Sequence, residues 1–327
     1  MRWSPPQSLA VALAGLTLGA LPWTASPLAH GQDPPPPAAA APDADLAKRV
    51  EELDGVINRH LAAGQIAEAV PPAREKLDLL ARIRGQDHWQ TGDARRNLET
   101  YSRLAGRPRE VQERFVKARQ ANARANQLDS RGQFAEAALL WQETLAIRRD
   151  ILGEGHPDTA ASYNNLAETL RAQGKYAEAE RLLRGLLDRQ RAKPPAYHPA
   201  VAGTLATLGP ILLDQRKWSE AEPVLRECLA IRQEAQPDEW STFDTRSQLG
   251  GSLLGQGRFA EAEPLLVTGY EGMKAREARI PAQGRPRLAA AARRVVELYE
   301  AWGKADKAAE WRAKFGSVEL PADVFAQ

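Results

Sequence analysis

The sequence has few of the residues that favour β-strands, since Val and Ile together account for only 21 of its 327 residues. Ala, Leu, Arg, Glu and Gln, which favour helices, are abundant instead. This composition argues against a large β-sheet. An excess of charge is also lacking, because 44 Lys and Arg residues are balanced by 42 Asp and Glu, for a formal net charge of +2. The chain therefore lacks the basic footprint of a nucleic-acid-binding protein, and we expect no nucleic-acid partner.

Cysteine is nearly absent, with Cys228 as the single example. An intramolecular disulfide is therefore excluded, and the fold must be held together by packing. Cys228 lies in a helical segment without basic or Cys-X-X-Cys context, so we interpret it as a small buried apolar residue. A lipoprotein is also not expected, because a lipid anchor needs a cysteine directly after the signal.

The first 31 residues contain one formal charge, Arg2, and an apolar run at residues 8–23. The run is short for a membrane span, which needs about 20 apolar residues, but suits the central region of a secretory signal. Ala29 and Gly31 provide small residues before a cleavage site at Gln32. Residues 1–31 are therefore predicted to be a signal peptide, and the protein to be exported (periplasmic or secreted). The alternative is an uncleaved membrane anchor at residues 8–23.

The chain after this segment divides into three parts. Residues 32–44 are rich in Pro and Ala, with four consecutive prolines, and are predicted to be a semi-rigid linker. Residues 45–316 carry a repeated pattern that predicts one helical domain. Residues 317–327 are predicted to form a loosely ordered tail.

The repeat is built on a seven-residue segment that starts at Gly132, Gly174, Arg216, Gly257 and Gly303, in steps of 42, 42, 41 and 46 residues. An earlier copy starts at Gly64 and a weaker one at Gly106. Glycine at the first position suits the end of a helix, where the backbone turns left-handed. The structural positions include glycines, an alanine five residues later, and a large apolar residue thirteen before that alanine: Gly132, Gly174, Gly257; Ala69, Ala137, Ala179, Ala221, Ala262, Ala308; Leu166, Leu208, Leu249. Small and large residues at these spacings predict pairs of antiparallel helices in close contact.

This pattern resembles the tetratricopeptide repeat, in the 42-residue form of the kinesin light chains. Residues 162–180 carry nearly the whole motif, and residues 152–159 carry the turn before it. The resemblance implies an all-α fold, an α-solenoid in which antiparallel helix pairs form a right-handed superhelix. It also implies a non-catalytic scaffold that binds a protein or peptide partner on a concave face lined by the first helix of each pair.

Two local features qualify the pattern. The turn at His156 recurs with the repeat, so we interpret His-Pro-Asp as a structural turn in which Asp158 or Thr159 caps the next helix. The histidines occur singly, without a second ligand at helical spacing, and we expect no metal or cofactor. The distance from Gly64 to Gly132 is 68 residues, or 42 plus 26. We therefore expect an extra helix or a long merged helix near residues 106–132, and a break in the regular array there.

No phosphate loop, dinucleotide motif, zinc-protease motif or nucleophile elbow occurs, so we expect no enzymatic activity. Glu178 and Glu180 are interpreted as favourable charges near a helix N-terminus, not as an acid–base pair.

The candidate binding residues are Asn164, Glu168 and Arg171, which would face the concave side and bind an extended peptide. The neighbouring repeats do not continue this polar set at the same positions, so we do not expect a clamp for a C-terminal carboxylate. The alternative function is a membrane-tethered structural or assembly factor that self-associates. Its partner, and its oligomeric state, do not follow from the sequence.

Overall fold

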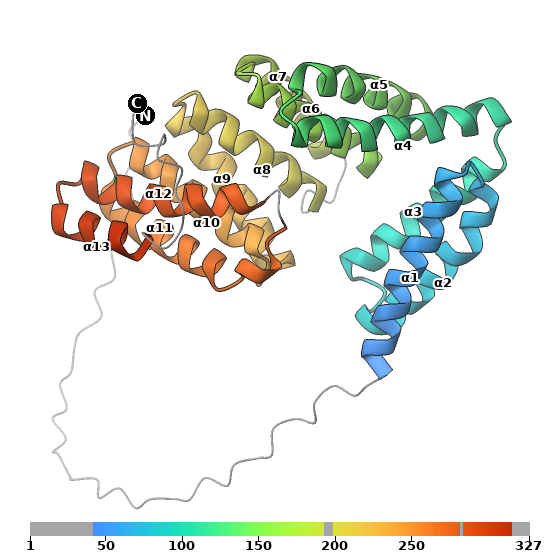
Figure 1. The fold of residues 1–327 in the computed structure, drawn as a ribbon, viewed down its shortest axis with the longest axis horizontal. Helices are drawn as coiled ribbons and strands as arrows, with labels where there is room; N and C mark the ends of the chain where they lie inside the picture. The colour runs from blue at the N-terminus through green and yellow to red at the C-terminus, as the bar shows by residue number, and fades with distance from the viewer. Residues whose placement is uncertain (1–41, 193–198, 282–283, 316–327) are drawn as a thin grey trace, which may run out of the picture. The chain divides into compact units, whose positions relative to one another are not determined.

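The structure, a computed structural model, describes residues 42–192, 199–281 and 284–315. In these ranges all regular secondary structure is helical, so the expected all-α fold is confirmed (Figure 1). The α-helices are α1 (Pro42–Ala62), α2 (Ile66–Arg84), α3 (Trp89–Ala105), α4 (Arg109–Ser130), α5 (Phe134–Leu152), α6 (Pro157–Ala172), α7 (Tyr176–Arg191), α8 (Pro199–Asp214), α9 (Trp218–Ala235), α10 (Trp240–Gly255), α11 (Phe259–Lys274), α12 (Arg285–Ala301) and α13 (Ala305–Phe315), with one 3₁₀ turn, Glu277–Arg279.

The predicted signal peptide, most of the predicted linker and the predicted tail lie outside the described residues. The linker prediction differs from the structure at one point, because α1 already begins at Pro42 and includes residues 42–44. Proline suits the first turn of a helix, where its missing N–H has no intrahelical partner.

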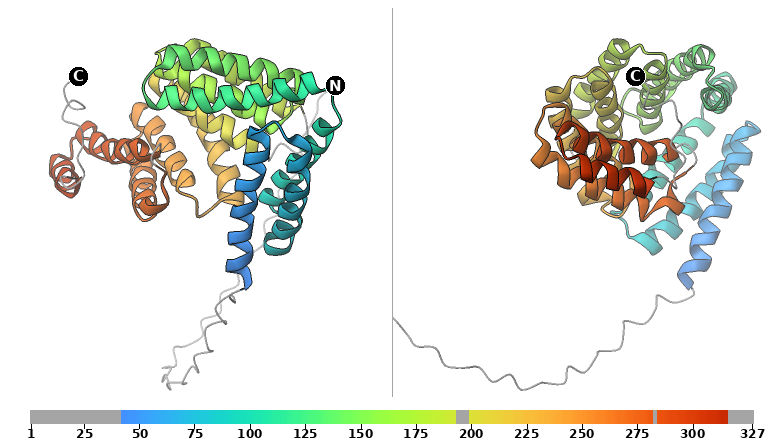
Figure 2. Two further views of the ribbon diagram at one scale, coloured as in Figure 1. Left: turned by 45° about the vertical axis from the view of Figure 1, so that its right-hand side comes forward. Right: turned by 60° about the vertical axis from the view of Figure 1, so that its left-hand side comes forward.

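Consecutive helices from α4 to α13 pack on one another as a stack of antiparallel hairpins, which confirms the α-solenoid (Figures 1 and 2). We call α6, α8, α10 and α12 the inner row and α5, α7, α9 and α11 the outer row. Each inner-row helix also contacts the next helix of its row, whereas the outer-row helices contact each other less. Helices on the inside of a bend come closer together than those on the outside. The stack therefore curves toward the inner row.

The repeated small residues lie at the helix–helix contacts. The alanines at 69, 137, 179, 221 and 262 are 0% exposed and Ala308 is 1% exposed, and the leucines at 166, 208 and 249 are 1–4% exposed. At Gly250 a Cβ atom would lie 2.7 Å from Cγ of Leu266, so the backbone of α10 approaches α11 too closely for any larger residue. The glycines at 132, 174 and 257 have φ angles of 72–74°, the left-handed conformation that ends the preceding helix.

The capping prediction at the repeated turn was wrong. His156 is the N-cap of α6, and its ring Nδ1 accepts a hydrogen bond from the backbone N–H of Asp158 at 3.1 Å. Thr159 is fully buried, and its hydroxyl donates to the carbonyl of Gly153 at 2.8 Å. The threonine therefore closes the turn, which leaves the capping role to the imidazole because its acceptor nitrogen reaches the free N–H groups.

Polar side chains at repeating positions tie each hairpin to the next. Arg148 on α5 donates to the Ser162 hydroxyl at 2.7 Å, and Arg232 on α9 donates to the Thr245 hydroxyl at 2.6 Å, each in the first turns of the following helix. The carboxylate of Glu180 on α7 reaches across the next hairpin, as described below. These ties recur because residues 42 or so apart occupy the same place in successive hairpins.

The helix α4 occupies the region where an irregularity is expected. It is one continuous helix of 22 residues that packs along α5 and contacts α3 little, although α3 precedes it in the chain. Phe115 on α4, 2% exposed, belongs to the apolar cluster of α1–α3, with Ile57 and Leu98. The helix α4 therefore serves both as the partner of α5 and as the support for α1–α3.

Candidate functional site

The three predicted binding residues lie along one side of α6, at spacings of four and three residues. Their side chains are partly exposed, with Glu168 at 31% and Arg171 at 32%. We call the surface that they share with the inner row the inner face. It consists of polar side chains from four helices, Asn164, Glu168, Arg171, Asp214, Asp244, Ser247, Arg287 and Arg294.

Arg171 joins α6 to α8. Its Nε lies 2.6 Å from Oδ2 of Asp214, and its Nη1 lies 3.3 Å from Oε2 of Glu168. Burial alone would lower the pKa of Arg171, but the contacts with these two carboxylates outweigh it, and the pKa is raised. The guanidinium is therefore held as a cation in a chain of ion pairs on the inner face.

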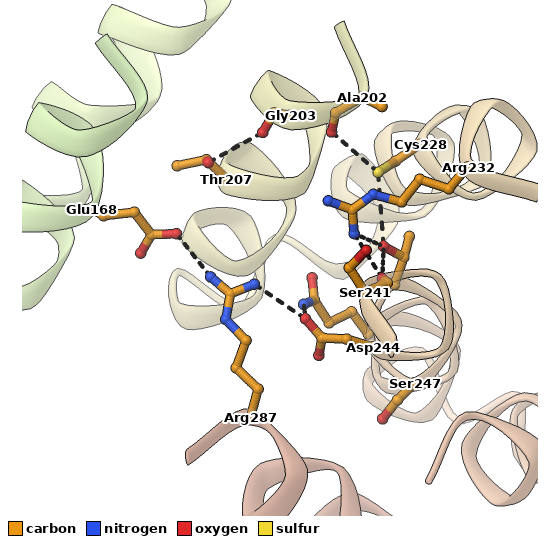
Figure 3. A network of polar contacts seen from close by, with 12 residues as sticks. Glu168, Ala202, Gly203, Thr207, Cys228, Arg232, Ser241, Asp244, Ser247 and Arg287 are labelled. Atoms are coloured by element: carbon orange, nitrogen blue, oxygen red, sulfur yellow. Dashed lines mark hydrogen bonds and ion pairs between the residues drawn. The ribbon is translucent and has the colours of Figure 1, made fainter. Parts of the chain in front are cut away.

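Arg287 on α12 joins three helices at once (Figure 3). Its two terminal nitrogens lie 3.4 Å from Oε1 of Glu168 on α6 and 3.1 Å from Oδ2 of Asp244 on α10. Asp244 is 1% exposed and also accepts a hydrogen bond from Gln248 at 2.8 Å. The contact between α6 and α12, which are 119 residues apart at these positions, requires the inner row to be strongly bent.

Arg294 lies one turn and a half further along α12 and differs from Arg287 in its partners. Its Nη1 donates to the Ser247 hydroxyl at 3.2 Å, but no carboxylate of the described residues lies within 4.0 Å. Burial is the main reason that the pKa of Arg294 is lowered. A Cβ at Gly251 would lie 3.1 Å from its Cδ, so the glycine makes room for the arginine.

Asn164 is the only one of the three predicted residues with a polar atom left unpaired. Its side-chain oxygen is buried without a hydrogen-bond partner among the described residues. Its amide nitrogen lies toward Gly203 of α8, 3.7 Å from the position that a Cβ there would take.

The structure extends the polar lining in a way that the repeat pattern does not predict. Asp214, Asp244 and Arg287 do not occupy the repeat positions of Glu168 or Arg171, which are apolar or small residues in the next repeats. A simple comparison of aligned positions therefore misses them. A search for any charged residue on the predicted first helices would have found all three.

The carboxylates at Glu178 and Glu180 do not form an acid–base pair. Glu178 is exposed, whereas Glu180 accepts hydrogen bonds from Lys217 and Gln215, both at 2.7 Å, and from Arg184 at 2.9 Å. Burial raises the pKa of Glu180, but these three donors outweigh it, and the pKa is lowered. Glu222 and Glu263 make the corresponding contacts in the next two hairpins. The carboxylate ladder thus links hairpins.

Two further searches concern the described ranges only. No group of three or more His, Cys, Asp or Glu residues there is arranged to hold a metal ion. None of the helices in those ranges is both long and apolar enough to cross a membrane. Cys228 is fully buried, its thiol contacts the Ala202 carbonyl at 3.4 Å, and burial raises the pKa of the thiol.

The family model described as "Tetratricopeptide repeat" matches residues 121–192 and, overlapping with them, residues 161–234. No curated protein matches the chain. A solved structure described as a kinesin light chain with nearly identical TPR-like repeats, from Podosopora anserina, is 22% identical, covers 62% of this chain and 93% of its own, and has a TM-score of 0.51. A Rap protein, complexed with competence and sporulation factor, is 14% identical, covers 84% of this chain and 77% of its own, and has a TM-score of 0.53. These identities establish a shared fold.

Proposed function

Since the chain is a tetratricopeptide repeat protein, whose fold is a scaffold for protein–protein interaction, we propose that it is exported and binds a protein or peptide segment on its inner face. The observation that carries this proposal is the concentration of charged groups from α6, α8, α10 and α12 on one curved surface. Structural ion pairs alone would not need four helices to converge there.

The ion pairs of the inner face are accessible to a partner. The side chains of Asp214 and Arg287 are 33% and 36% exposed, close to those of Glu168 and Arg171. A bound segment that carries both charges exchanges these internal pairs for pairs with its own side chains. Such an exchange contributes mainly to specificity, because the internal pair that is lost offsets most of the pair that is gained.

The unpaired oxygen of Asn164 adds a hydrogen-bond acceptor beside these charges. A backbone N–H of an extended segment is the group that it would accept from. A buried acceptor without a donor costs about 1–3 kcal/mol, so a partner that satisfies it gains affinity.

The test uses capture of partners from an envelope extract, with the wild type and the double variant Asn164→Ala/Arg171→Ala. Arg184→Ala is the matched control, because Arg184 is an exposed, ion-paired arginine on the outer-row helix α7. We expect the wild type and the control to retain the same partner and the double variant to lose it. Equal recovery by all three proteins would contradict binding on the inner face.

Export is tested separately, by N-terminal sequencing of the mature protein. A start at Gln32 is the expected result, from the small residues Ala29 and Gly31. A mature chain that keeps residues 1–31 and fractionates with membranes would contradict cleavage and favour the tethered assembly factor. Light scattering then distinguishes the two, because only the assembly factor must self-associate.

A further inference from the structure

A cavity of about 340 Å³ lies between α5, α6 and α7, away from the inner face. Its floor consists of Tyr163, Leu166 and Leu170 of α6, which are only 2–5% exposed. Helical periodicity turns these three residues to the opposite side of α6 from Asn164, Glu168 and Arg171. The volume is at the lower end of the range of about 300–1,000 Å³ found for ligand pockets.

The wall of the cavity is more basic than acidic. Arg149 of α5 and Arg189 of α7 share the carboxylate of Glu154, at 2.6 and 3.6 Å. The guanidinium carbon of Arg189 lies 5.0 Å from the ring centre of Tyr163. Arg181, also on the wall, has no carboxylate within 4.0 Å among the described residues. One carboxylate thus neutralises two arginines, and a third arginine is unpaired.

The repeat shows why this place has a surplus of positive charge. In the next hairpin, the outer-row helix α9 places Glu220 and Glu227 opposite Arg184 and Arg191 of α7, at 2.6 and 2.5 Å. These two ion pairs hold neighbouring outer-row helices together.

One repeat earlier, the second of these pairs is incomplete. The positions of Arg191 and Glu227 correspond, 42 residues back, to Arg149 on α5 and Gly185 on α7. Arg149 is therefore present without the carboxylate that the repeat pairs with it. The space is also unfilled, since a Cβ at Gly185 would meet only Nη1 of Arg189 within 4 Å, at 3.5 Å.

Arg189 is a second departure at the same place. The corresponding residues on α5 and α9 are Ile147 and Ile231, which are 9% and 3% exposed. An arginine thus stands where the repeat has an apolar core residue, and the cavity floor beside it stays open. Two substitutions on one face of α7 together produce a pocket with an apolar floor and a cationic wall.

We propose that this cavity binds an acidic side chain of a protein partner, with an apolar side chain next to it in the partner's sequence. The carboxylate takes the place that Gly185 leaves vacant, next to Arg149 and Arg181. The apolar neighbour packs on Leu166 and Leu170. This site is additional to the inner face and uses a different side of α6.

The test measures binding of two fluorescein-labelled, amidated peptides to the full chain at low salt, by fluorescence anisotropy. The first peptide is Gly-Ala-Leu-Glu-Ala-Gly, and the second has Gln in place of Glu. We expect the first to bind at least about tenfold more tightly, because only it carries the carboxylate. Equal binding of the two peptides would overturn the proposal.

Gly185→Glu supplies the missing carboxylate from the protein itself and should weaken binding of the first peptide at least about tenfold. The matched control is Gly55→Glu on α1, because Gly55 is also a helical glycine whose Cβ would meet only the arginine four residues on, at 3.5 Å. This control should leave binding unchanged. Arg181→Ala, which removes an exposed side chain without filling space, should weaken binding as well.

Unchanged binding to both Gly185→Glu and Arg181→Ala would overturn the proposal. Free N-acetylleucine is the third probe. Competition by this free carboxylate, in the absence of peptide binding, would overturn the assignment to a protein partner and point to a small-molecule site.

Discussion

The helices α6–α12 and the helices α1–α3 are built from the same short repeat but are joined to their neighbours differently. In α6–α12, the carboxylates of Glu180, Glu222 and Glu263 tie each hairpin to the next. The corresponding residues in the earlier part of the chain are Val70 and Ala138, which have no polar group to offer. The motif therefore specifies helix pairs in both parts, whereas regular stacking depends on polar residues between the pairs.

The largest expected effect comes from breaking the contact between the two parts. Phe115→Ala should lower the stability of α1–α3 by about 3–5 kcal/mol, because it removes a buried ring from the cluster around Ile57 and Leu98. Hydrogen exchange of the peptide groups, followed by mass spectrometry, should show faster opening in α1–α3 than in α6–α11. The control Leu139→Ala, at a side chain that is 66% exposed, should change stability by no more than about 0.5 kcal/mol. Equal losses across all helices would show that the two parts unfold as one.

The second prediction compares one glycine from each part. Gly250→Ala should destabilise the array by about 1–3 kcal/mol, because the added methyl group overlaps Leu266 at 2.7 Å. Gly55→Ala in α1 has open space and a helical backbone, so it should stabilise by up to about 1 kcal/mol. Urea denaturation gives both values. Changes of the same sign would contradict the difference in helix spacing.

The carboxylate ladder makes a prediction about pH. Because the pKa of Glu180 is lowered in the folded state, its contribution to stability is complete above the unfolded value of about 4.3 and is lost as the pH falls through the folded value. Glu180→Gln should therefore cost about 1–2 kcal/mol at pH 7 and progressively less in acid. Denaturation at pH 7 and at pH 3 measures the two differences. Glu75→Gln, at an exposed ion pair with Arg49, should have the smaller effect at both.

A constant loss for Glu180→Gln at every pH would contradict the role of its charge. A larger effect for Glu75→Gln would contradict the comparison itself, since it would show stronger ties in α1–α3 than in the array.

The smallest effect concerns His156, which connects the two parts. Its Nδ1 accepts from Asp158, so Nε2 carries the proton and donates to the Thr100 hydroxyl of α3 at 2.9 Å. Burial is the main reason that the pKa of His156 is lowered, so stability is complete above about pH 6.5 and is lost as the pH falls below it. We expect a loss of about 1 kcal/mol between pH 7 and pH 5, because the protonated ring no longer caps α6. His156→Asn keeps an acceptor that does not titrate and should abolish this loss.

Hydrogen exchange of α3 and α6 at the two pH values measures this effect. No difference between pH 7 and pH 5 in the wild type would contradict it, as would an equal difference in the His156→Asn variant.

Much of the fold follows directly from residue spacing. A glycine, an alanine five residues later and a leucine before them define a helix pair, because close approach of two helices tolerates few residues at those points. The same reasoning misplaced the cap at His156. Any acceptor near a helix start serves as a cap, and which one does so depends on the conformation of the turn.

The inner face followed from the sequence only in part. Asn164, Glu168 and Arg171 share one side of α6 because of helical periodicity, which acts within a single helix. Their contacts with Asp214 and Arg287 depend on how far the stack bends. Bending results from many packing contacts between helices, and no short stretch of sequence encodes it.

The sequence by itself therefore determined that this protein is a helical repeat with pairs of about 42 residues, because small and large residues recur at positions where helices touch. Only the tertiary structure decided which charges meet, since Glu168, Asp244 and Arg287 come together across 119 residues of chain. It also decided where the repeat leaves a cavity, at Gly185 and Arg189. The physical reason is the same in both cases, because side-chain pairs between hairpins form only after the stacking angle is set.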